Sequence, residues 1–474
     1  MNLPDEFIEK YTKLLGDEAE SFFESFDTEP QKGFRLNPLK SNYQNVALNL
    51  EHPVDYSAVG YVGSVSGNSL EHQTGYVYSQ DLSAMYVGEV CGPRPGEKIL
   101  DLCAAPGGKS SHLASLMNNE GLLVSNEINR KRALILAENM ERIGARNVIV
   151  TNEDPSGLVK TFEQFFDKIV VDAPCSGEGM FRKDHAATKY WHKDYPNECA
   201  ARQKLILADA MKMLKQGGTL VYSTCTFAPE EDEQIITWLL NEYPYLELVP
   251  IKKYSGMDEG RPAFSDGNEE LRGCVRLMMH HFKGEGHFIA KLKDMRPVGE
   301  NVSKKKKGKK KHGKKSAMSS EQVELWQNFA KEFELEGFSL SNLKVLGDHL
   351  YLYQESWPDI SRLKFIRPGF LLGTFKKKRF EPSYGLALAL DPAKCQRKLA
   401  VEKEDWQKYV AGNVISLKER PAQGNGWYLL ECEDKAFAFG KVVDSRISFR
   451  RDFEYLDDKK GTLLDAFTKG FLIL

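Results

Sequence analysis

The sequence predicts an α/β fold built around a doubly wound parallel sheet. Between residues 97 and 241, short apolar segments that end in small or polar residues alternate with longer amphipathic segments. This alternation is typical of a sheet whose parallel strands are joined by helices. The expected strands are residues 98–103, 122–128, 147–154, 168–175 and 219–225, and the expected helices are residues 109–117, 130–143, 197–215 and 229–241.

An antiparallel hairpin is expected at the end of this sheet. Residues 274–282 and 287–293 are apolar segments that flank the turn KGEG. Two such segments around a short glycine-containing turn indicate a β-hairpin. A parallel sheet finished in this way is typical of S-adenosylmethionine-dependent methyltransferases and differs from the sheet of dehydrogenases.

The segments on either side of the sheet predict smaller units. Residues 1–27 space their apolar side chains as amphipathic helices, and residues 427–443 predict a hairpin in a small β-rich domain. Nine lysines within residues 303–315 form a segment without apolar content, which we expect to tether two folded parts. Without these nine lysines, the chain has 56 basic and 67 acidic residues, a net charge of −11. Such an acidic body does not predict a protein that coats nucleic acid with its whole surface.

No membrane segment or metal centre is predicted. The N-terminus MNLPDEFIEK has no signal-peptide features, and no apolar run approaches the roughly 18 residues of a membrane span, so we expect a cytoplasmic protein. The eight cysteines include no CxxC pair and are expected to be free thiols. His280, His281 and His287 lie on the predicted hairpin without further ligands, so we expect no metal there.

A loop of small residues follows the first predicted strand, in the segment DLCAAPGGKS at 101–110. Small residues let the backbone approach a ligand at the carboxyl end of a strand, where open α/β sheets bind cofactors. The loop matches neither GxGxxG nor GxxxxGK[ST], which disfavours a dinucleotide or a P-loop nucleotide. Glu127 and Asp154 end the next two predicted strands, where carboxylates can reach the ribose and the adenine of a nucleoside cofactor.

Cys175 and Cys225 end the fourth and fifth predicted strands, so both thiols should face one crevice. A lone cysteine is usually an inert buried side chain, but packing poorly explains two thiols beside a cofactor loop. Amino-group methyltransferases usually carry a Pro-Pro-aromatic segment after the fourth strand. Here Pro174 and Cys175 hold that place, which favours covalent activation of a carbon atom.

Cytosine methylation at carbon 5 is a reaction that needs such a thiol. Carbon 5 is too weak a nucleophile to attack a methyl sulfonium until a thiolate has added to carbon 6. Asp172, three residues before Cys175, is placed to supply an acid near ring nitrogen 3. The base must leave its stack to be reached, so single-stranded or distorted RNA is the expected substrate. Position alone leaves open which of Cys175 and Cys225 is the nucleophile.

Four segments resemble the Sun/Nop2-type RNA cytosine-5 methyltransferases, and in particular the bacterial ribosomal small-subunit methyltransferase F type. They are DLCAAPGGKS, VTNED, DAPCSGEGMFRKD and YSTCTF, and the similarity extends from GFRLNPLK (33–40) to GEGHFIAKL (284–292). The resemblance implies a Rossmann-like class I methyltransferase fold with S-adenosylmethionine as cofactor. It implies that Cys225 is the nucleophile and that Cys175 helps to release the product. The residues that would hold the cofactor are Cys103, Ala104, Ala105, Pro106, Gly107, Gly108, Lys109, Glu127, Asp154 and Asp172.

The resemblance also implies a C-terminal PUA-like domain. The segment DSRISFRRDFEYL after residues 440–443 departs from the basic, proline-containing stretch of the family, which leaves RNA contact by this domain open. We expect Arg35, Arg182 and Lys183 to contact the RNA. The expected parts of the chain are an N-terminal helical, RNA-recognition module (1–90), a methyltransferase domain (91–296), a lysine-rich linker (297–317), an intermediate α+β region (318–390) and the PUA-like domain (391–474).

The leading hypothesis is S-adenosylmethionine-dependent methylation of cytosine carbon 5 in 16S rRNA of the 30S subunit, without an obligate protein partner. A tRNA or 23S rRNA target is an alternative that the catalytic motifs do not separate. A vestigial RNA-binding assembly factor is disfavoured by the intact pair of cysteines and the complete cofactor loop. A nicotinamide-dependent oxidoreductase is disfavoured because GxGxxG is absent.

Overall fold

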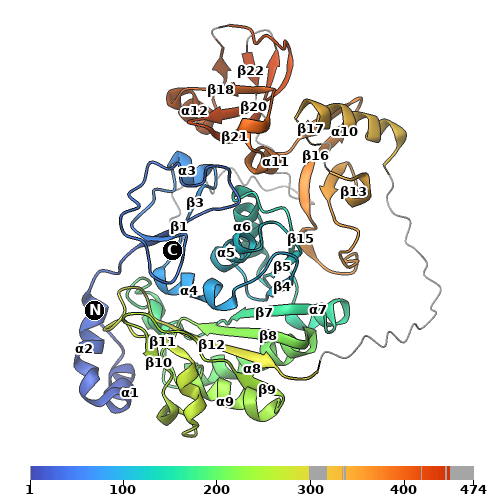
Figure 1. Ribbon diagram of the computed structural model, residues 1–474. Helices are drawn as coiled ribbons and strands as arrows, with labels where there is room; N and C mark the ends of the chain where they lie inside the picture. Colours follow the sequence, from blue (N-terminus) through green and yellow to red (C-terminus); the bar gives the residue numbers. More distant parts are fainter. Residues whose placement is uncertain are drawn as a thin grey trace, which may run out of the picture.

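A mixed sheet of ten strands forms the centre of the computed structural model, which describes residues 2–297, 318–333, 335, 338–417, 419–443 and 446–448 (Figure 1). Its strands run in the order β10-β11-β12-β8-β7-β4-β5-β6-β15, and β9 pairs with β12. The five parallel strands are β4 (Lys98–Asp101), β5 (Leu122–Asn126), β6 (Val148–Thr151), β7 (Phe166–Asp172) and β8 (Leu214–Thr224). The predicted α/β class is therefore confirmed. The expected lysine-rich linker lies outside the described residues, apart from Pro297.

Helices cover both faces of the sheet, as a doubly wound fold requires. One face packs against α4 (Leu82–Cys91), α5 (Gly108–Leu116) and α6 (Arg130–Arg142). The other face packs against α7 (Pro155–Phe162), α8 (Tyr195–Met213) and α9 (Glu233–Glu242). Helix α7 is an addition to the predicted elements. Its signals are a capping Asp154, which accepts from Ser156 N, and a proline at the first helical position.

The predicted antiparallel end of the sheet is present, and its first strand is shorter than expected. Strand β12 (His287–Asp294) pairs antiparallel with β8 and with β11 (Val275–Leu277). Residues 278–282 leave the sheet because Met278 and Met279 pack among the aromatic side chains of the N-terminal helices. The short strands β9 (Leu246–Leu248) and β10 (Asp258–Glu259) complete this end.

The N-terminal part combines a helical unit with a small sheet. Helices α1 (Asp5–Leu15) and α2 (Ala19–Glu24) pack through Phe7, Tyr11 and Phe22 onto Phe181, Trp191 and Phe227, which follow β7 and β8 in the chain. A three-stranded sheet follows, in the order β2-β1-β3. Its elements are β1 (Gly33–Leu36), β2 (Gly60–Val62), α3 (Leu70–Gln73) and β3 (Val77–Ser79).

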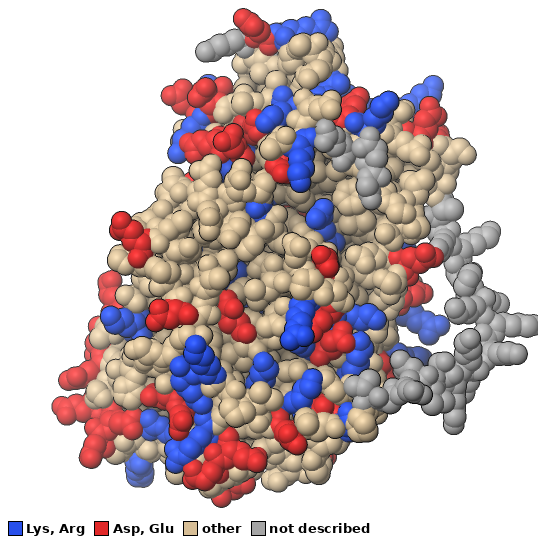
Figure 2. All heavy atoms as spheres, viewed as in Figure 1, with Lys and Arg blue, Asp and Glu red and all other residues tan. Residues whose placement is uncertain are grey.

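The helical unit α1–α2 has an acidic surface. Residues 5–27 contain eight acidic and two basic side chains. Figure 2 shows the acidic groups gathered over this unit, at the lower left of the view. Repulsion from phosphates therefore makes this surface a poor place for RNA, and the unit's contacts with the loops after β7 and β8 indicate a structural role.

Two further sheets form the C-terminal part, which lies above the N-terminal sheet in Figure 1. The first contains β13 (Leu343–Leu346), β14 (His349–Leu352), β16 (Phe370–Lys376) and β17 (Arg379–Pro382), with α10 (Ser320–Glu332) and α11 (Tyr384–Ala389) beside it. The second contains β18 (Lys398–Ala400), β20 (Gly426–Cys432), β21 (Lys435–Val443), β22 (Arg446–Ser448) and β19 (Ile415–Ser416), with α12 (Lys403–Val410). The hairpin expected at 427–443 is β20 and β21. No helix in the described ranges is long and apolar enough to cross a membrane.

Strand β15 (Phe365–Arg367) connects the C-terminal part to the central sheet. It pairs antiparallel with β6 at the edge of the sheet. The Arg367 side chain is buried and donates to the carbonyls of Val148, at 3.0 Å, and Ala145, at 2.6 Å. Buried carbonyls need such donors, so this arginine fixes the two parts relative to each other.

Replacing this arginine should weaken the whole chain. We expect Arg367→Met to lower the free energy of unfolding by about 2–4 kcal/mol, because two buried carbonyls lose their donor. The control is Arg379→Met, which removes an exposed guanidinium paired with Glu381 and should change stability by less than about 0.5 kcal/mol. Chemical denaturation measures both. Equal effects of the two substitutions would contradict the assignment.

Candidate active site

The carboxyl ends of four parallel strands meet at one edge of the sheet and carry the predicted site residues. Asp101 at the end of β4 is in register with Ser125 of β5 and Val170 of β7. Asp172 at the end of β7 is in register with Ser223 of β8. The loop at 101–110, Glu127, Asp172, Cys175 and Cys225 therefore follow neighbouring strand ends.

The loop between β4 and α5 is held against α6. Arg132 donates to the carbonyl of Ala105 and Asn139 donates to that of Pro106, each at 2.7 Å. Gly107 has a φ of +112°, and a Cβ atom there would lie 3.1 Å from the ends of two α6 side chains. A larger residue would be strained and crowded, so the glycine lets the loop lie flat over α6.

Two acidic groups beside this loop fit a nucleoside cofactor. Asp101 is fully buried, and its Oδ2 accepts from Ser110 Oγ at 2.7 Å. Its Oδ1 has no hydrogen-bond partner among the described residues, and burial raises the pKa of this carboxyl to about 7. Glu127 follows β5, with Oε1 accepting from Asn129 N at 2.8 Å and Oε2 lying 3.4 Å from Arg132 Nη1. A cradle of backbone and carboxylate acceptors is what the amine and ribose hydroxyls of such a cofactor require.

Asp154 caps the helix that follows it. Its side chain is exposed and caps α7, accepting from Ser156 N at 3.0 Å and Ser156 Oγ at 2.5 Å. The carboxylate is thus engaged by its own helix, and contact with an adenine stays a prediction.

Asp172 is held as an anion. Its Oδ2 lies 2.7 Å from Lys109 Nζ, and its Oδ1 accepts from Ser223 Oγ at 2.8 Å. His287 Nε2, which is buried and otherwise unpartnered among the described residues, lies 3.7 Å from the same Oδ1. Burial alone would raise the pKa of Asp172, but Lys109 and His287 outweigh it and hold the pKa well below its usual range. The group therefore accepts hydrogen bonds at neutral pH, and a proton for a substrate must come from a neighbouring donor.

The two predicted thiols meet. Cys175 Sγ and Cys225 Sγ are 3.3 Å apart, and both side chains are partly exposed. The hydrogen bond to Cys225, together with burial, raises the pKa of Cys175 well above its usual value. Cys175 therefore stays protonated at neutral pH and can donate a hydrogen bond to Cys225 Sγ. All eight cysteines are free, as expected.

Two buried glutamates that the sequence analysis missed fix the loops of these thiols. Glu231 accepts from Ser176 N at 3.0 Å, from the Ser176 hydroxyl and from Gln203 Nε2 at 2.7 Å. Burial raises the pKa of Glu231 to about 8. The Glu178 carboxylate accepts hydrogen bonds from four donors, which are Tyr11 OH, Trp191 Nε1 (2.9 Å), Thr226 Oγ1 (2.9 Å) and Phe227 N (3.3 Å). A charged residue between small ones in Ser-Gly-Glu-Gly was the available signal for Glu178.

Two of the three residues expected to contact RNA are buried. Arg35 is 2% exposed and donates to Gly108 O at 2.9 Å and Ser111 Oγ at 2.7 Å. Arg182 is 8% exposed and donates to Gly284 O at 2.7 Å and Thr28 Oγ1 at 3.0 Å. The structure therefore corrects the expectation: both guanidinium groups support the protein interior. Lys183 is partly exposed, so its RNA contact stays a prediction.

The three histidines considered as metal ligands separate. His287 faces Asp172, whereas His280 and His281 lie with Glu18 in one group whose ligand atoms are within 4.8 Å of one another. Arg261 already pairs with Glu18 at 2.6 Å, and Asp258 pairs with His281 at 2.8 Å. These ion pairs account for the group without a metal.

The four donors around Glu178 make a specific prediction. In Glu178→Gln, an amide N–H must face either Trp191 Nε1–H or Phe227 N–H, neither of which can accept a hydrogen bond. We expect the free energy of unfolding to fall by about 2–4 kcal/mol in chemical denaturation. Glu9→Gln removes an exposed charge paired with Lys13 on α1 and should cost less than about 0.5 kcal/mol. A neutral Glu178→Gln would show that the carboxylate does not hold the loops.

The buried carboxyl of Asp101 predicts a pH effect. Because folding raises its pKa to about 7, ionisation costs stability, and the cost grows as the pH rises from about 4 to about 7. Asp101→Asn cannot ionise, so between pH 5 and pH 8 its free energy of unfolding should gain about 2–3 kcal/mol relative to the unsubstituted protein. Denaturation curves across this range measure the difference. Two parallel pH profiles would contradict the assignment.

Family models match most of the chain. The model described as 16S rRNA methyltransferase RsmB/F matches residues 89–293, which include the loop and both thiols. Models of the N-terminal domain, the first C-terminal domain and the PUA domain of RsmF match residues 3–82, 328–390 and 396–448.

Relatives and a solved structure agree with these matches. A ribosomal RNA small subunit methyltransferase F from Vibrio parahaemolyticus is 29% identical over 96% of this chain and 98% of its own. That of Shewanella loihica is 32% identical over 75% of this chain and 73% of its own. The crystal structure of a methyltransferase homologue from Pyrococcus horikoshii is 32% identical, with a TM-score of 0.54 over 61% of this chain and 94% of that chain. With the paired thiols beside the glycine loop, these matches place the chain in the 16S rRNA methyltransferase RsmB/F family.

Proposed function

We propose that this protein methylates carbon 5 of a cytosine in 16S rRNA within the 30S subunit. The observation that carries the proposal is the pair of thiols, 3.3 Å apart, at the strand ends beside the glycine loop. A thiol is needed for attack at carbon 6, whereas direct methyl transfer to an amino group needs none. The names of the Vibrio and Shewanella relatives support ribosomal RNA of the small subunit as the substrate.

S-adenosylmethionine is the cofactor, and when bound it supplies the methyl group. The residues that would hold it are the loop Cys103–Lys109, with Glu127 toward the ribose, Asp154 toward the adenine and Asp172. The unpartnered Oδ1 of buried Asp101 is a further acceptor beside this loop.

Cys225 is the nucleophile in this proposal. Its sulfur lies 3.3 Å from that of Cys175, whose raised pKa keeps the Cys175 thiol protonated and able to donate a hydrogen bond to it. The thiolate forms a bond to carbon 6 of the cytosine, and the electron pair of the ring double bond becomes available at carbon 5. After methylation, loss of the carbon 5 proton restores the double bond and breaks the bond to Cys225. Cys175, in contact with Cys225, assists this release.

Asp172 orients the base. As a carboxylate it is suited to accept from the 4-amino group of cytosine, which is a hydrogen-bond donor. Lys109 Nζ, 2.7 Å from this carboxylate, is a proton source in contact with it. The sequence predicts that Asp172 acts as the acid near nitrogen 3. In this proposal the role is divided: Asp172 aligns the ring, and Lys109 carries the proton.

The site of action follows from the substrate. We propose that the protein works in the cytoplasm, where it meets rRNA of the 30S subunit, and that it needs no obligate protein partner. The PUA domain matched at residues 396–448 supports RNA binding by the C-terminal part.

The two thiols give opposite predictions. The protein is incubated with radiolabelled S-adenosylmethionine and, separately, with 30S subunits, naked 16S rRNA, 50S subunits and tRNA. We expect label at cytosine carbon 5 in 16S rRNA, in 30S subunits. Cys175→Ala should accumulate a covalent RNA adduct that survives denaturing electrophoresis, because release fails, and Cys225→Ala should form none.

Cys199→Ala is the control, because this thiol is buried in α8 and should leave methylation within about twofold. Exchanged behaviour of the two variants would assign the nucleophile to Cys175. Label in 50S subunits or tRNA would assign the substrate to 23S rRNA or tRNA in place of 16S rRNA. No label in any RNA would indicate a binding factor without activity.

A further inference from the structure

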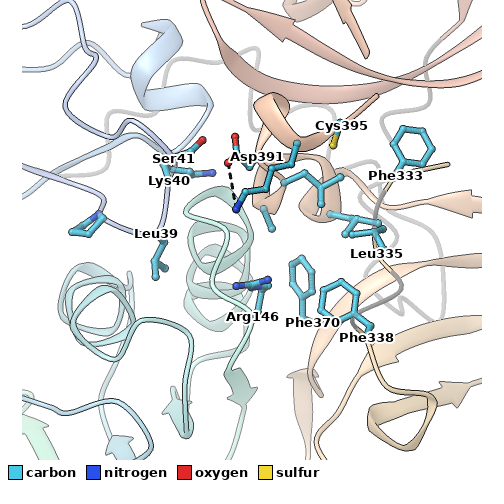
Figure 3. Close-up of a pocket in the computed structure, with 15 residues that line it drawn as sticks. Leu39, Lys40, Ser41, Arg146, Phe333, Leu335, Phe338, Phe370, Asp391 and Cys395 are labelled. Atoms are coloured by element: carbon cyan, nitrogen blue, oxygen red, sulfur yellow. Dashed lines mark ion pairs between the residues drawn. The ribbon is translucent and has the colours of Figure 1, made fainter. Parts of the chain in front are cut away.

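A cavity lies away from the thiols, where three parts of the chain meet. Its volume is about 560 Å³, and Figure 3 shows Lys40 and Ser41 of the N-terminal part on one side and Phe333 and Leu335 of the C-terminal part on the other. Arg146 contributes from the connection between α6 and β6. Because β6 begins at Val148, this is the amino edge of the sheet, opposite the edge that carries Cys175 and Cys225.

Arg146 is an unpaired cation at this cavity. Its side chain is partly buried, and its guanidinium has no hydrogen-bond or ion-pair partner among the described residues. Burial lowers its pKa, and no carboxylate offsets that effect. A guanidinium that is partly removed from solvent and has no ion-pair partner is stabilised when an anion binds to it. Its planar set of N–H donors matches the oxygens of a phosphate.

Two lysines lie beside Arg146 in the lining of the cavity. Lys40 Nζ donates to the carbonyls of Leu388 and Arg142, and burial followed by repulsion from Arg142 lowers its pKa to about 7. Lys394 is largely exposed and lies 3.8 Å from Asp391, the acidic residue of the lining. The cations therefore outnumber the carboxylates around the cavity.

The remaining wall is apolar. Phe338 and Phe370 lie beside Arg146 in Figure 3, with Leu335 close to them. Leu390 also lines the cavity. The volume lies within the range of small-molecule sites, about 300–1,000 Å³. Cations beside aromatic and aliphatic side chains match the two halves of a nucleotide, which are a charged phosphate and a flat apolar base.

We propose that this cavity binds one nucleotide of the substrate RNA strand, with its phosphate at Arg146 and Lys394 and its base against the wall around Phe338. The inference rests on the proposed function, because it takes RNA as the substrate. A contact at the amino edge of the sheet holds the strand at a distance from the reacting cytosine. It therefore contributes to affinity and leaves turnover at saturating RNA unchanged.

The first test compares two cations by filter binding of 30S subunits and 16S rRNA at several salt concentrations. Arg146→Ala should weaken binding about tenfold and lower the slope of log K against log salt by about 1. Arg146→Lys should keep the slope. The matched control is Lys377→Ala, which removes an exposed charge at the turn between β16 and β17, outside the cavity. Equal losses of RNA affinity in Arg146→Ala and Lys377→Ala would show that only the total positive charge of the protein matters, and would overturn the proposal.

The second test fills the cavity without changing its charge. Ala389→Phe places a ring among the lining residues and should weaken RNA binding about as much as Arg146→Ala. Thermal unfolding and S-adenosylmethionine binding, both unchanged, establish that each variant is folded. RNA affinity unchanged in Ala389→Phe and in Arg146→Ala would overturn the proposal.

A third experiment tests whether the cavity binds a nucleotide within an RNA strand or a free nucleotide. RNA containing 4-thiouridine should crosslink to the lining residues of the unsubstituted protein, and cytidine monophosphate at about 1 mM should not displace it. Displacement would assign the cavity to a free nucleotide and overturn the proposal. Because binding and crosslinking are measured without methyl transfer, absence of methylation would count against the proposed function alone.

Discussion

One buried carboxylate, Glu178, joins the elements on which the reactive site depends. It lies in the loop after β7 and accepts from Thr226 and from Phe227 N in the loop after β8, so it locks the two thiol-bearing loops together. It also accepts from Tyr11 of α1, which makes the N-terminal helices part of the same unit. A buried anion is tolerated only with several donors, and each of these donors is fixed by its own element. The 3.3 Å separation of Cys175 and Cys225 is a consequence of that constraint.

The same edge of the sheet keeps its carboxyl groups in different protonation states. Lys109 and His287 keep Asp172 ionised, whereas burial raises the pKa of Asp101 to about 7 and that of Glu231 to about 8. Neighbouring acids with separated pKa values can take separate roles. Asp172 accepts hydrogen bonds at the reacting centre, and protonated Glu231 holds Ser176 beside Cys175 without adding a charge to this loop.

The sequence predicted the parallel core well because each strand is a short apolar run. The candidate site residues stand directly after these runs, so their place in the fold could be predicted as well. It predicted the meeting of Cys175 and Cys225 for the same reason. It did not predict β15, because a three-residue strand carries little local signal and is made by pairing with β6. Arg35 and Arg182 were misassigned to RNA because the sequence around an arginine does not show whether its side chain is exposed to solvent or buried against backbone carbonyls. Only tertiary packing distinguishes the two.

The two edges of the sheet divide the work of recognition. The carboxyl edge holds charges that are already paired, such as Lys109 with Asp172, and so is arranged for chemistry on one base. The amino edge holds Arg146, whose charge has no partner among the described residues, and so is arranged for a ligand that brings one. Arg367 fixes the C-terminal part beside this edge through the carbonyls of Ala145, in the α6–β6 connection, and Val148, at the start of β6. A rigid junction matters here, since a nucleotide held between parts that moved independently would give little affinity.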